Sequence, residues 1–509
     1  VGAAYWILPD YSEIINEQRS RNGTLILDRN SKIIRLLPDD QGSFRIWCEI
    51  EQAPNDLKKC ILAAEDKRFF YHPGFDPIAI LRALYSNLSA GRVKSGASTI
   101  TQQVIRLIHP RPRTYKSKLI ELLSACKMEI QLSKEQILEL YINLCPMGGN
   151  IRGVAFAAKK YFGKSVDRIN MAESAILAVL PRSPSKFDPM HAKGQKRLFL
   201  EKDRLLKRMA ELGWIESDTL KIMTGPMASF KNRPVPLEAP HFVDFLMTKN
   251  VCQQSLIKTT IDLNLQHSME EIFRSQIKRL HKLGIEQAGL IIASVKDSEV
   301  LAMIGSLEYA TKYQGFNNAT LALRGAGSVL KPFLYAVAIE QGKNSFTEIP
   351  DTYKTYATPQ GDYQPYNADR RWYGPVSLRL ALGDSLNVPA VKTLQEIGVG
   401  EFYKHLERLG LINEKSDPPE HYGLGLAIGN IEVNLFRLVQ AYGALARLGI
   451  YKQLKVICGK TEEQHRVFSP ETTYLISHIL ADPCARLLTF GNPYYYDFGF
   501  PVSVKTGTS

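Results

Sequence analysis

A serine and a lysine three residues apart could form the reactive centre of a covalent enzyme. Ser328 and Lys331 lie in the run Gly327–Pro332, and on a helix this spacing places both side chains on one face. A serine hydroxyl is a poor nucleophile, and a lysine whose pKa is lowered can take its proton. If Ser328 opens the helix, Pro332 lies near the first turn, where its missing N–H does least harm. The pattern occurs by chance in many chains, so it needs support from other residues.

Two further motifs follow Ser328 along the chain. They are Ser385-Leu386-Asn387 and Lys505-Thr506-Gly507-Thr508. Alone, Ser385-Leu386-Asn387 would be explained by a helix cap. The three motifs in this order are typical of serine acyl-transferases that react with penicillin. The second half of the sequence therefore predicts acyl transfer through Ser328.

A separate group of candidate residues lies in the first half. The segment Leu57–Phe70 has one apolar face and ends in the run Glu65–Phe70, and the polar stretch Gly96–Gln103 opens a later helix. Small hydroxyl and amide side chains suit hydrogen bonding to a sugar or a diphosphate. Cations follow closely, at Arg106, Arg111, Arg113, Lys116 and Lys118. A charge run is most often a solvated face, and Lys118 with Glu121 would equally make a surface ion pair at i,i+3.

The elements that position these residues differ between the two halves. Strand-like alternation over 23–36 gives way to helical spacing from Asp56 to about Met227. Asp76-Pro77 predicts the start of a helix that runs to about Ala90, and Ser133 with Gln136 is a capping box.

In the second half, the apolar runs 289–295 and 300–305 predict a hairpin of buried strands. Helices are expected around Ser328 and over 376–396. This mixture of strands and helices indicates an α/β domain.

The chain of 509 residues is too long for one core, so we expect two to four domains. A proline-rich stretch around Pro226–Pro240 marks the junction. We predict a membrane-anchor remnant and connector over 1–22, a first domain over 23–225, a linker region over 226–285 and a second domain over 286–509. Val1–Leu8 is apolar but too short to span a bilayer; a buried strand or a frayed end would also explain it.

Composition limits the function classes. Apolar residues make up 45% and charged residues 23%, which is ordinary for globular proteins. A net charge of +13 favours attraction to an anionic membrane or a phosphorylated substrate. Motifs of nucleic-acid binding are absent from the sequence. The seven cysteines are scattered without metal or disulfide spacing, which indicates buried apolar filler.

The first half resembles the family 51 peptidoglycan glycosyltransferases, and with the three serine motifs the chain resembles class A, bifunctional penicillin-binding proteins. The similarity covers roughly residues 45–509. Ala97-Ser98-Thr99, Pro146–Asn150 and Gly361–Pro365 are most similar to the 1C subgroup. The five glycosyltransferase motifs lie, in order, at Glu65–Gly74, Ser98–Gln103, Lys118 with Glu121, Ile137–Asn143, and Gly153 with Ala157–Lys164.

The resemblance implies a mainly α-helical, lysozyme-like glycosyltransferase domain lying on the membrane. An α/β penicillin-recognising transpeptidase domain would follow, and its central antiparallel sheet would carry Lys505–Gly507 as a strand. In the family, further strand and helix follow this segment, so we expect the natural chain to extend beyond Ser509 and acylation to be poor without that extension.

The resemblance also assigns roles in the first site, whose substrate would be lipid II, a disaccharide-pentapeptide on an undecaprenyl diphosphate. Glu65 would be the general base on the acceptor hydroxyl, in an inverting transfer. Glu121 would hold Lys118, orient the donor or help bind a divalent cation; no cofactor is otherwise required. The remaining substrate-binding residues would be Ser98, Thr99, Gln102 and Gln103, with Arg106, Arg113 and Lys118 on the departing diphosphate.

In the second site, Ser328 would attack the fourth peptide bond of a stem peptide and expel D-alanine. Lys331 would take its proton, Ser385 would relay a proton, and Asn387 and Lys505 would hold the network. The substrate carboxylate would bind Thr506 and Thr508 beside Gly507, and the N–H groups of Ser328 and Thr508 would form the oxyanion hole.

The expected partners are lipid II and glycan strands, penicillin and other β-lactams, the bacterial inner membrane and other cell-wall proteins, without nucleic acid. The catalytic domains would lie outside the cytoplasm on a single-pass anchor. Two alternatives remain open. A β-lactamase or carboxypeptidase would leave the five glycosyltransferase motifs unused, and a non-catalytic cell-wall scaffold would not need Glu65, Glu121, Ser328 and Lys331.

Overall fold

The computed structural model describes residues 8–90, 97–112, 114–225, 230, 234–249, 256–311, 314–358, 361–412, 416–459, 463–492 and 498–508. Arg113 and most of the apolar N-terminal stretch therefore lie outside the described residues. The chain divides into two compact units, each with its own buried apolar cluster. The first unit comprises Val1–Leu27, Ile33–Leu237 and Asn250–Ile257, and the second comprises Asp28–Lys32, Glu238–Lys249 and Lys258–Ser509.

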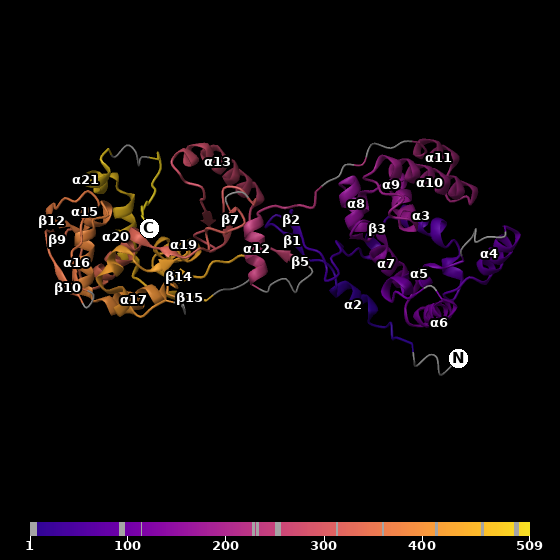
Figure 1. Ribbon diagram of the computed structural model, residues 1–509, viewed down its shortest axis with the longest axis horizontal. Helices are drawn as coiled ribbons and strands as arrows, with labels where there is room; N and C mark the ends of the chain where they lie inside the picture. The colour runs from indigo at the N-terminus through magenta and orange to yellow at the C-terminus, as the bar shows by residue number, and fades with distance from the viewer. Residues whose placement is uncertain are drawn as a thin grey trace. The chain divides into compact units, whose positions relative to one another are not determined.

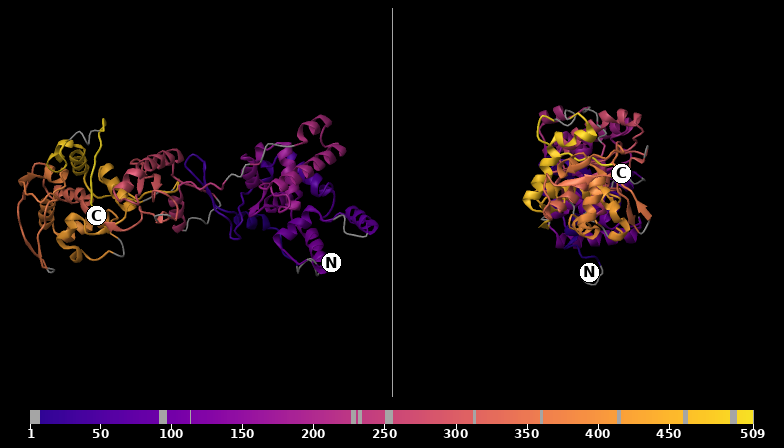
Figure 2. Two further views of the ribbon diagram at one scale, coloured as in Figure 1. Left: turned by 45° about the horizontal axis from the view of Figure 1, so that its top comes forward. Right: turned by 90° about the vertical axis from the view of Figure 1, so that its left-hand side faces the viewer.

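The first unit is mainly helical, as the indigo-to-magenta part of the chain shows in Figures 1 and 2. Its small sheets are a three-stranded one of the order β2–β1–β5, in which β1 and β2 are antiparallel, and the antiparallel pair β3–β4. The helices are α2 (Ile14–Ser20), α3 (Asn55–Glu65), α4 (Pro77–Ala90), α5 (Ile100–Ile108), α6 (Tyr115–Gln131), α7 (Lys134–Leu144), α8 (Val154–Phe162), α9 (Met171–Val179), α10 (Ala192–Glu211) and α11 (Ser217–Met223), and the strands are β1 (Leu25–Leu27), β2 (Ile33–Leu36), β3 (Pro146–Gly148), β4 (Ile151–Arg152) and β5 (Leu256–Lys258).

Helix α9 forms the centre of the first core. All nine of its residues are buried, which is the pattern of a helix surrounded by others. Asn170 and Glu173 cap its start reciprocally. Helices α3 and α10 pack against it, so the end of α3 and the turn after α9 have fixed positions.

Helix α5 packs against α6 and α7. Thr99 caps α5 and accepts a hydrogen bond from Gln102 N. The caps predicted at Ser133 and Asp76 are confirmed: Ser133 begins α7 with Gln136, and Asp76 accepts from Ala79 N at 2.9 Å before α4.

The second unit combines helices with antiparallel pairs of strands, and the predicted hairpin is confirmed as β6–β7. The helices are α12 (Pro240–Thr248), α13 (Leu263–Lys282), α14 (Lys331–Glu340), α15 (Leu378–Gly383), α16 (Asn387–Ile397), α17 (Val399–Arg408), α18 (Pro419–Tyr422), α19 (Leu435–Ala446), α20 (Pro470–Ala481) and α21 (Leu487–Phe490), and the strands are β6 (Leu290–Ala293), β7 (Val300–Ile304), β8 (Arg324–Gly325), β9 (Glu348–Asp351), β10 (Tyr356–Thr358), β11 (Gly361–Tyr363), β12 (Gly374–Ser377), β13 (Glu432–Val433), β14 (Ile450–Lys452) and β15 (Gln464–Arg466).

One detail differs from the expectation. Residues 501–508 are not a strand in the described chain. Their backbone bonds to helical residues instead, because Val504 N donates to Leu480 O at 2.9 Å and Arg486 donates to Val504 O at 2.5 Å. A segment without a ladder partner cannot count as part of a sheet. The region predicted as a linker contains α12, β5 and α13, and the predicted domain boundaries stay a prediction.

Helix α14 is the central helix of the second core. Its first eight residues, Lys331–Ala338, are buried, and α16 and α20 pack against it. Pro332 lies in its first turn, as the sequence predicts. Ser328 lies immediately before it, in the 3-10 turn Gly327–Leu330.

Candidate active sites

Glu65 ends α3 and is largely buried. Its carboxylate accepts a hydrogen bond from Gln103 Nε2 at 2.8 Å and lies 2.7 Å from Arg182 Nε. Two donors on separate elements therefore fix its orientation, as a general base requires. Arg182 also donates to the carbonyl of Ala64.

Arg182 was missed in the sequence. It lies in a 3-10 turn, Leu180–Arg182, directly after the buried helix α9. Because α3 packs against α9, the ends of these two elements meet, and a residue 117 positions away reaches Glu65. No local pattern marks such a contact.

Lys118, Glu121 and Arg106 form a second charged cluster. Lys118 Nζ lies 2.6 Å from Glu121 Oε1, 3.1 Å from Ser98 Oγ and 3.3 Å from Gln102 Oε1. Arg106 lies 3.5 Å from the same carboxylate. The predicted pair is thus a real ion pair with further partners, and Glu121 holds both cations.

Helix α5 links the two clusters, because its neighbouring residues Gln102 and Gln103 contact Lys118 and Glu65 respectively. A cavity of about 530 Å³ opens beside Lys118. Its lining includes both cations of the cluster, which gives a phosphate group two charge-assisted donors. The lining residues are Ser98, Ile105, Arg106, His109, Arg111, Pro112, Thr114, Tyr115, Ser117, Lys118 and Glu121.

Replacing Lys118 by alanine is expected to lower kcat for glycan polymerisation about a hundredfold, with little change in the KM for the lipid donor. In the glycosyl transfer that the family resemblance implies, the ammonium would be needed most when negative charge develops on the leaving diphosphate. Steady-state rates with lipid II test this. Lys116→Ala is the matched control, because Lys116 is exposed two residues away and does not line the cavity. An increase in KM alone would make Lys118 a simple binding residue.

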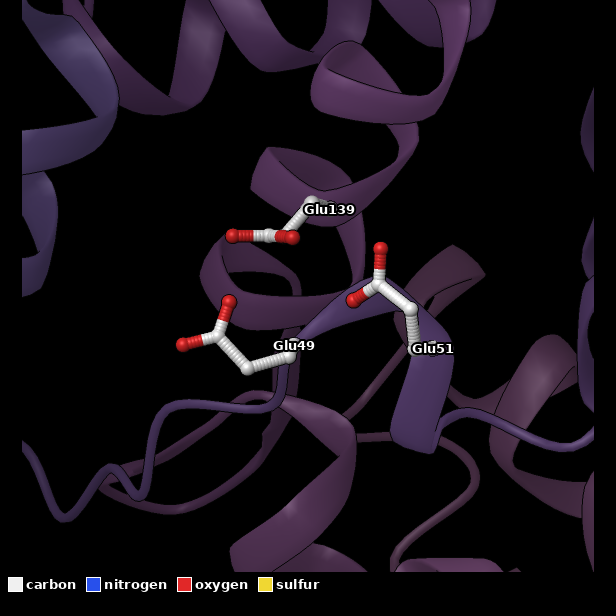
Figure 3. Close-up of side chains that lie close together, drawn as sticks. All are labelled: Glu49, Glu51 and Glu139. Carbon is white, nitrogen blue, oxygen red and sulfur yellow. The ribbon is translucent and has the colours of Figure 1, made fainter.

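Three other carboxylates gather in the first unit, at Glu49, Glu51 and Glu139 (Figure 3). Arg19 pairs with Glu49 at 2.6 Å and with Glu139 at 3.2 Å, and Glu139 accepts N–H groups of Trp47 and Ile50. The arginine already balances much of this charge. Among the described residues, neither Glu65 nor Glu121 belongs to such a group of three possible cation ligands.

In the second unit, Lys331 is fully buried at the start of α14. Burial, reinforced by the charge of Lys505, holds the pKa of Lys331 well below its usual value. A lowered pKa favours the neutral form of the amine, which can accept a proton. Ser328 stands one turn before it, half-buried, and within the described residues its hydroxyl makes no hydrogen bond that would occupy it.

The hydrogen bonds of Lys331 connect it to Ser385 and Asn387. A neutral amine has two N–H groups and one lone pair. The two shortest contacts of Nζ are to Ser385 O at 2.5 Å and to Asn387 Oδ1 at 2.7 Å, and Ser385 Oγ lies 3.4 Å away. In the neutral form, the two N–H groups would bond to Ser385 O and Asn387 Oδ1, and the lone pair would be available for a proton from a hydroxyl.

Ser385 connects the two lysines. Lys505 Nζ donates to Ser385 Oγ at 2.9 Å, and burial with the nearby Arg486 lowers the pKa of Lys505 to about 7. Ser385 has a φ of +57°, a left-handed conformation that is uncommon for a residue with a side chain. The tight turn between α15 and α16 holds Ser385 in this strained conformation, and the conformation sets the direction of its side chain.

Asn387 is held by residues that the motif does not reveal. Its Nδ2 donates to Tyr366 O at 2.8 Å, and Asn367 Oδ1 accepts from the Asn387 N–H at 2.8 Å. Asn367 in turn donates to Asp351 at 2.8 and 3.0 Å, and both of these side chains are buried. Asp351 and Asn367 are thus positioning residues for the start of α16.

The Lys505–Thr508 segment lies against the Ser328 turn. Gly327 has a φ of +61°, and a Cβ there would lie 2.1 Å from Thr508 O. Only glycine permits this approach. The two predicted oxyanion-hole residues, Ser328 and Thr508, are therefore neighbours in space. Thr506, Gly507 and Thr508 are exposed, as a substrate-binding segment must be.

Lys505→Gln is expected to move the acid limb of the penicillin acylation profile to higher pH. Removing the neighbouring cation relieves its repulsion with protonated Lys331, so the pKa of Lys331 rises and the base is lost at a higher pH. Acylation rates measured across the acidic and neutral range test this, with the exposed Lys404→Gln as control. A slower rate with an unmoved limb would mean that Lys505 acts only in binding.

Two family models match the chain. A transglycosylase model matches residues 30–210, and a model of the penicillin-binding protein transpeptidase domain matches residues 288–509. The Glu65 and Lys118 clusters fall within the first match, and the Ser328 centre falls within the second. The predicted order of a helical glycosyltransferase domain and a transpeptidase domain is confirmed.

Whole-chain relatives agree. The chain is 31% identical over 479 residues to penicillin-binding protein 1C of Escherichia coli (strain K12), over 92% of this chain and 60% of the relative. It is 29% identical over 536 residues to penicillin-binding protein 1A of Aquifex aeolicus (strain VF5), over 87% of this chain and 70% of the relative. It therefore spans less than two thirds of the first of these relatives. The crystal structure of penicillin-binding protein 1A from Haemophilus influenzae shares the fold, with a TM-score of 0.51 at 18% identity over 91% of this chain and 79% of that chain.

Proposed function

The chain belongs to the class A, bifunctional penicillin-binding proteins, and from this premise we propose that it polymerises lipid II and cross-links the stem peptides of the product. The observation that carries the proposal is the presence of two separate groups of reactive side chains in one chain. One is the oriented Glu65 carboxylate, which helix α5 links to a cavity lined by cations. The other is a buried lysine whose pKa is lowered, one turn after the Ser328 hydroxyl.

In glycosyl transfer, Glu65 removes the proton of the acceptor hydroxyl, whose oxygen attacks the anomeric carbon of the donor. The bond from that carbon to the diphosphate breaks, and Lys118 and Arg106 stabilise the departing charge. Gln103 and Arg182 keep the Glu65 carboxylate in place, and Glu121 keeps the cations at the cavity. Arg113, outside the described residues, remains a proposed diphosphate ligand by family resemblance.

In acyl transfer, Ser328 Oγ bonds to the carbonyl carbon of a stem peptide while Lys331 Nζ takes its proton. The C–N bond breaks, and the proton passes through Lys331 and Ser385 to the departing D-alanine. The amine of a second stem then attacks the acyl-serine and restores the hydroxyl. Thr506 and Thr508 bind the terminal carboxylate, and β-lactams occupy the same place.

A lipid surface fits the exposed apolar side chains of the first unit. Ile78, Leu81 and Tyr85 lie exposed on one face of α4, and Tyr115 and Leu119 are exposed at the start of α6. Tyr115 also lines the cavity at Lys118. We propose that this face meets the outer leaflet of the inner membrane, where the lipid tail of the donor lies.

None of the helices in the described part of the chain is long and apolar enough to cross a bilayer. The single-pass anchor and other cell-wall partners remain proposals from the family.

Incubating the purified chain with lipid II and separating the products by gel electrophoresis tests the first activity, and digestion of the product to muropeptides tests the second. Polymer containing cross-linked dimers supports the proposal. Polymer without dimers, together with release of D-alanine, would instead indicate a carboxypeptidase. Intact lipid II would indicate a scaffold.

A further inference from the structure

Three aromatic side chains lie exposed near the acyl-transfer centre. Tyr353, Tyr366 and Trp372 are 62%, 43% and 43% exposed. The ring centroids of Tyr366 and Trp372 are 6.1 Å apart, and those of Trp372 and Tyr353 are 6.0 Å apart. We call these three residues the aromatic row. Adjoining large rings that remain in water mark a binding surface more often than scattered single residues do.

Strand pairing places the row. Strands β9 and β12 pair antiparallel with Gly374 opposite Asp351, and they lie together with α16 in Figure 1. Continuing this register by two residues sets Trp372 opposite Tyr353. Asp351 also accepts the N–H of Tyr373 at 2.9 Å, and Asn367 donates to Arg371 O at 2.8 Å. Buried hydrogen bonds therefore fix the backbone that carries the row.

The same segment touches the catalytic network. The carbonyl of Tyr366 accepts a hydrogen bond from Asn387, whose Oδ1 accepts from Lys331. One backbone carbonyl and one side chain thus separate the first ring from the base. Trp372 and Tyr353 then continue the row ring by ring.

The chemistry of the row suits a sugar that carries a peptide. The face of a pyranose ring presents C–H groups, which the negative face of an aromatic ring attracts. Arg370, 6.0 Å from the Tyr366 ring centroid, adds a cation for the carboxylates of a stem peptide. Four extended residues span at most about 14 Å, so the sugar that bears a stem lies within that reach of the acylated carbonyl.

We propose that the aromatic row is a sugar subsite, which holds the glycan strand whose stem peptide acylates Ser328. The inference rests on the proposed transpeptidase function and extends it to the substrate class. A substrate attached to glycan would use the row, whereas a free peptide or a β-lactam would react without it.

The test compares three acylating substrates in the full chain: stem peptides on glycan strands, the same pentapeptide without sugar, and benzylpenicillin. Trp372→Ala and Tyr353→Ala are expected to lower kcat/KM for the glycan-borne stem about tenfold, the loss expected for one stacking ring. The other two substrates should react at the wild-type rate. Trp372→Phe keeps a ring and should restore most of the loss.

Tyr474→Ala is the matched control, because Tyr474 is also 62% exposed but lies on α20. A similar loss on all three substrates would show that the row only supports Asn387, and no loss on any would show that it binds no sugar; either result overturns the proposal. Failure of the proposed function would give a different result: none of the three substrates would acylate the wild-type chain.

Discussion

Glu65→Gln is expected to reduce glycan polymerisation by about a thousandfold or more, the range for loss of a general base. The amide cannot remove the proton from the acceptor hydroxyl. It also turns an N–H group toward either Gln103 or Arg182, both of which are donors. Penicillin should still acylate Ser328, because that centre lies in the other compact unit.

The experiment measures polymer from lipid II and labelled penicillin on one preparation. Glu129→Gln is a matched control, since Glu129 is a carboxylate of the same unit that pairs with Lys134 at 2.7 Å and accepts from Thr101. The control should polymerise normally even if it is somewhat less stable. Polymerisation by Glu65→Gln at the wild-type rate would remove Glu65 as the general base.

Ser328→Ala is expected to abolish the covalent penicillin adduct and all cross-links, while glycan polymerisation continues. Without the hydroxyl no acyl-enzyme forms, and losing a nucleophile of this kind lowers turnover about a millionfold. Intact-protein mass spectrometry after exposure to benzylpenicillin reports the adduct directly.

Ser503→Ala provides the comparison for Ser328→Ala. Ser503 lies two residues before Lys505 and donates only to Ser477 O within the described contacts. In the Ser503→Ala variant, the penicillin adduct on Ser328 should form as in the wild type. An adduct on the Ser328→Ala chain would show that another residue is the nucleophile.

Much of both sites follows from local sequence. Ser328 and Lys331 are one turn apart, so the sequence alone places them near each other. Lys118 and Glu121 share a helix face, and helical geometry alone brings them into contact. The capping box of Thr99 and Gln102 likewise belongs to the polar stretch that the sequence marks. The residues of each pair are close together along the chain, so secondary structure alone determines their relative positions.

Contacts between distant segments could not be predicted in this way. Arg182 reaches Glu65 only because α3 packs on α9, and Asn367 reaches Asn387 only because the segment after β11 folds over the start of α16. An arginine after a proline and an asparagine in a loop are ordinary residues locally. Tertiary packing selects them, and it also ties Val504 to α20 where the sequence suggested a strand.

The left-handed backbone conformation of Ser385 lowers stability at a position whose side chain the activity needs. Glycine at this position would relieve strain of roughly 1 kcal/mol. Selection for heat resistance alone would therefore favour replacement of the serine by glycine. The hydroxyl that contacts both lysines would vanish with it. Variants selected for thermal stability can therefore lose activity through this one substitution. The serine at this position favours function over stability.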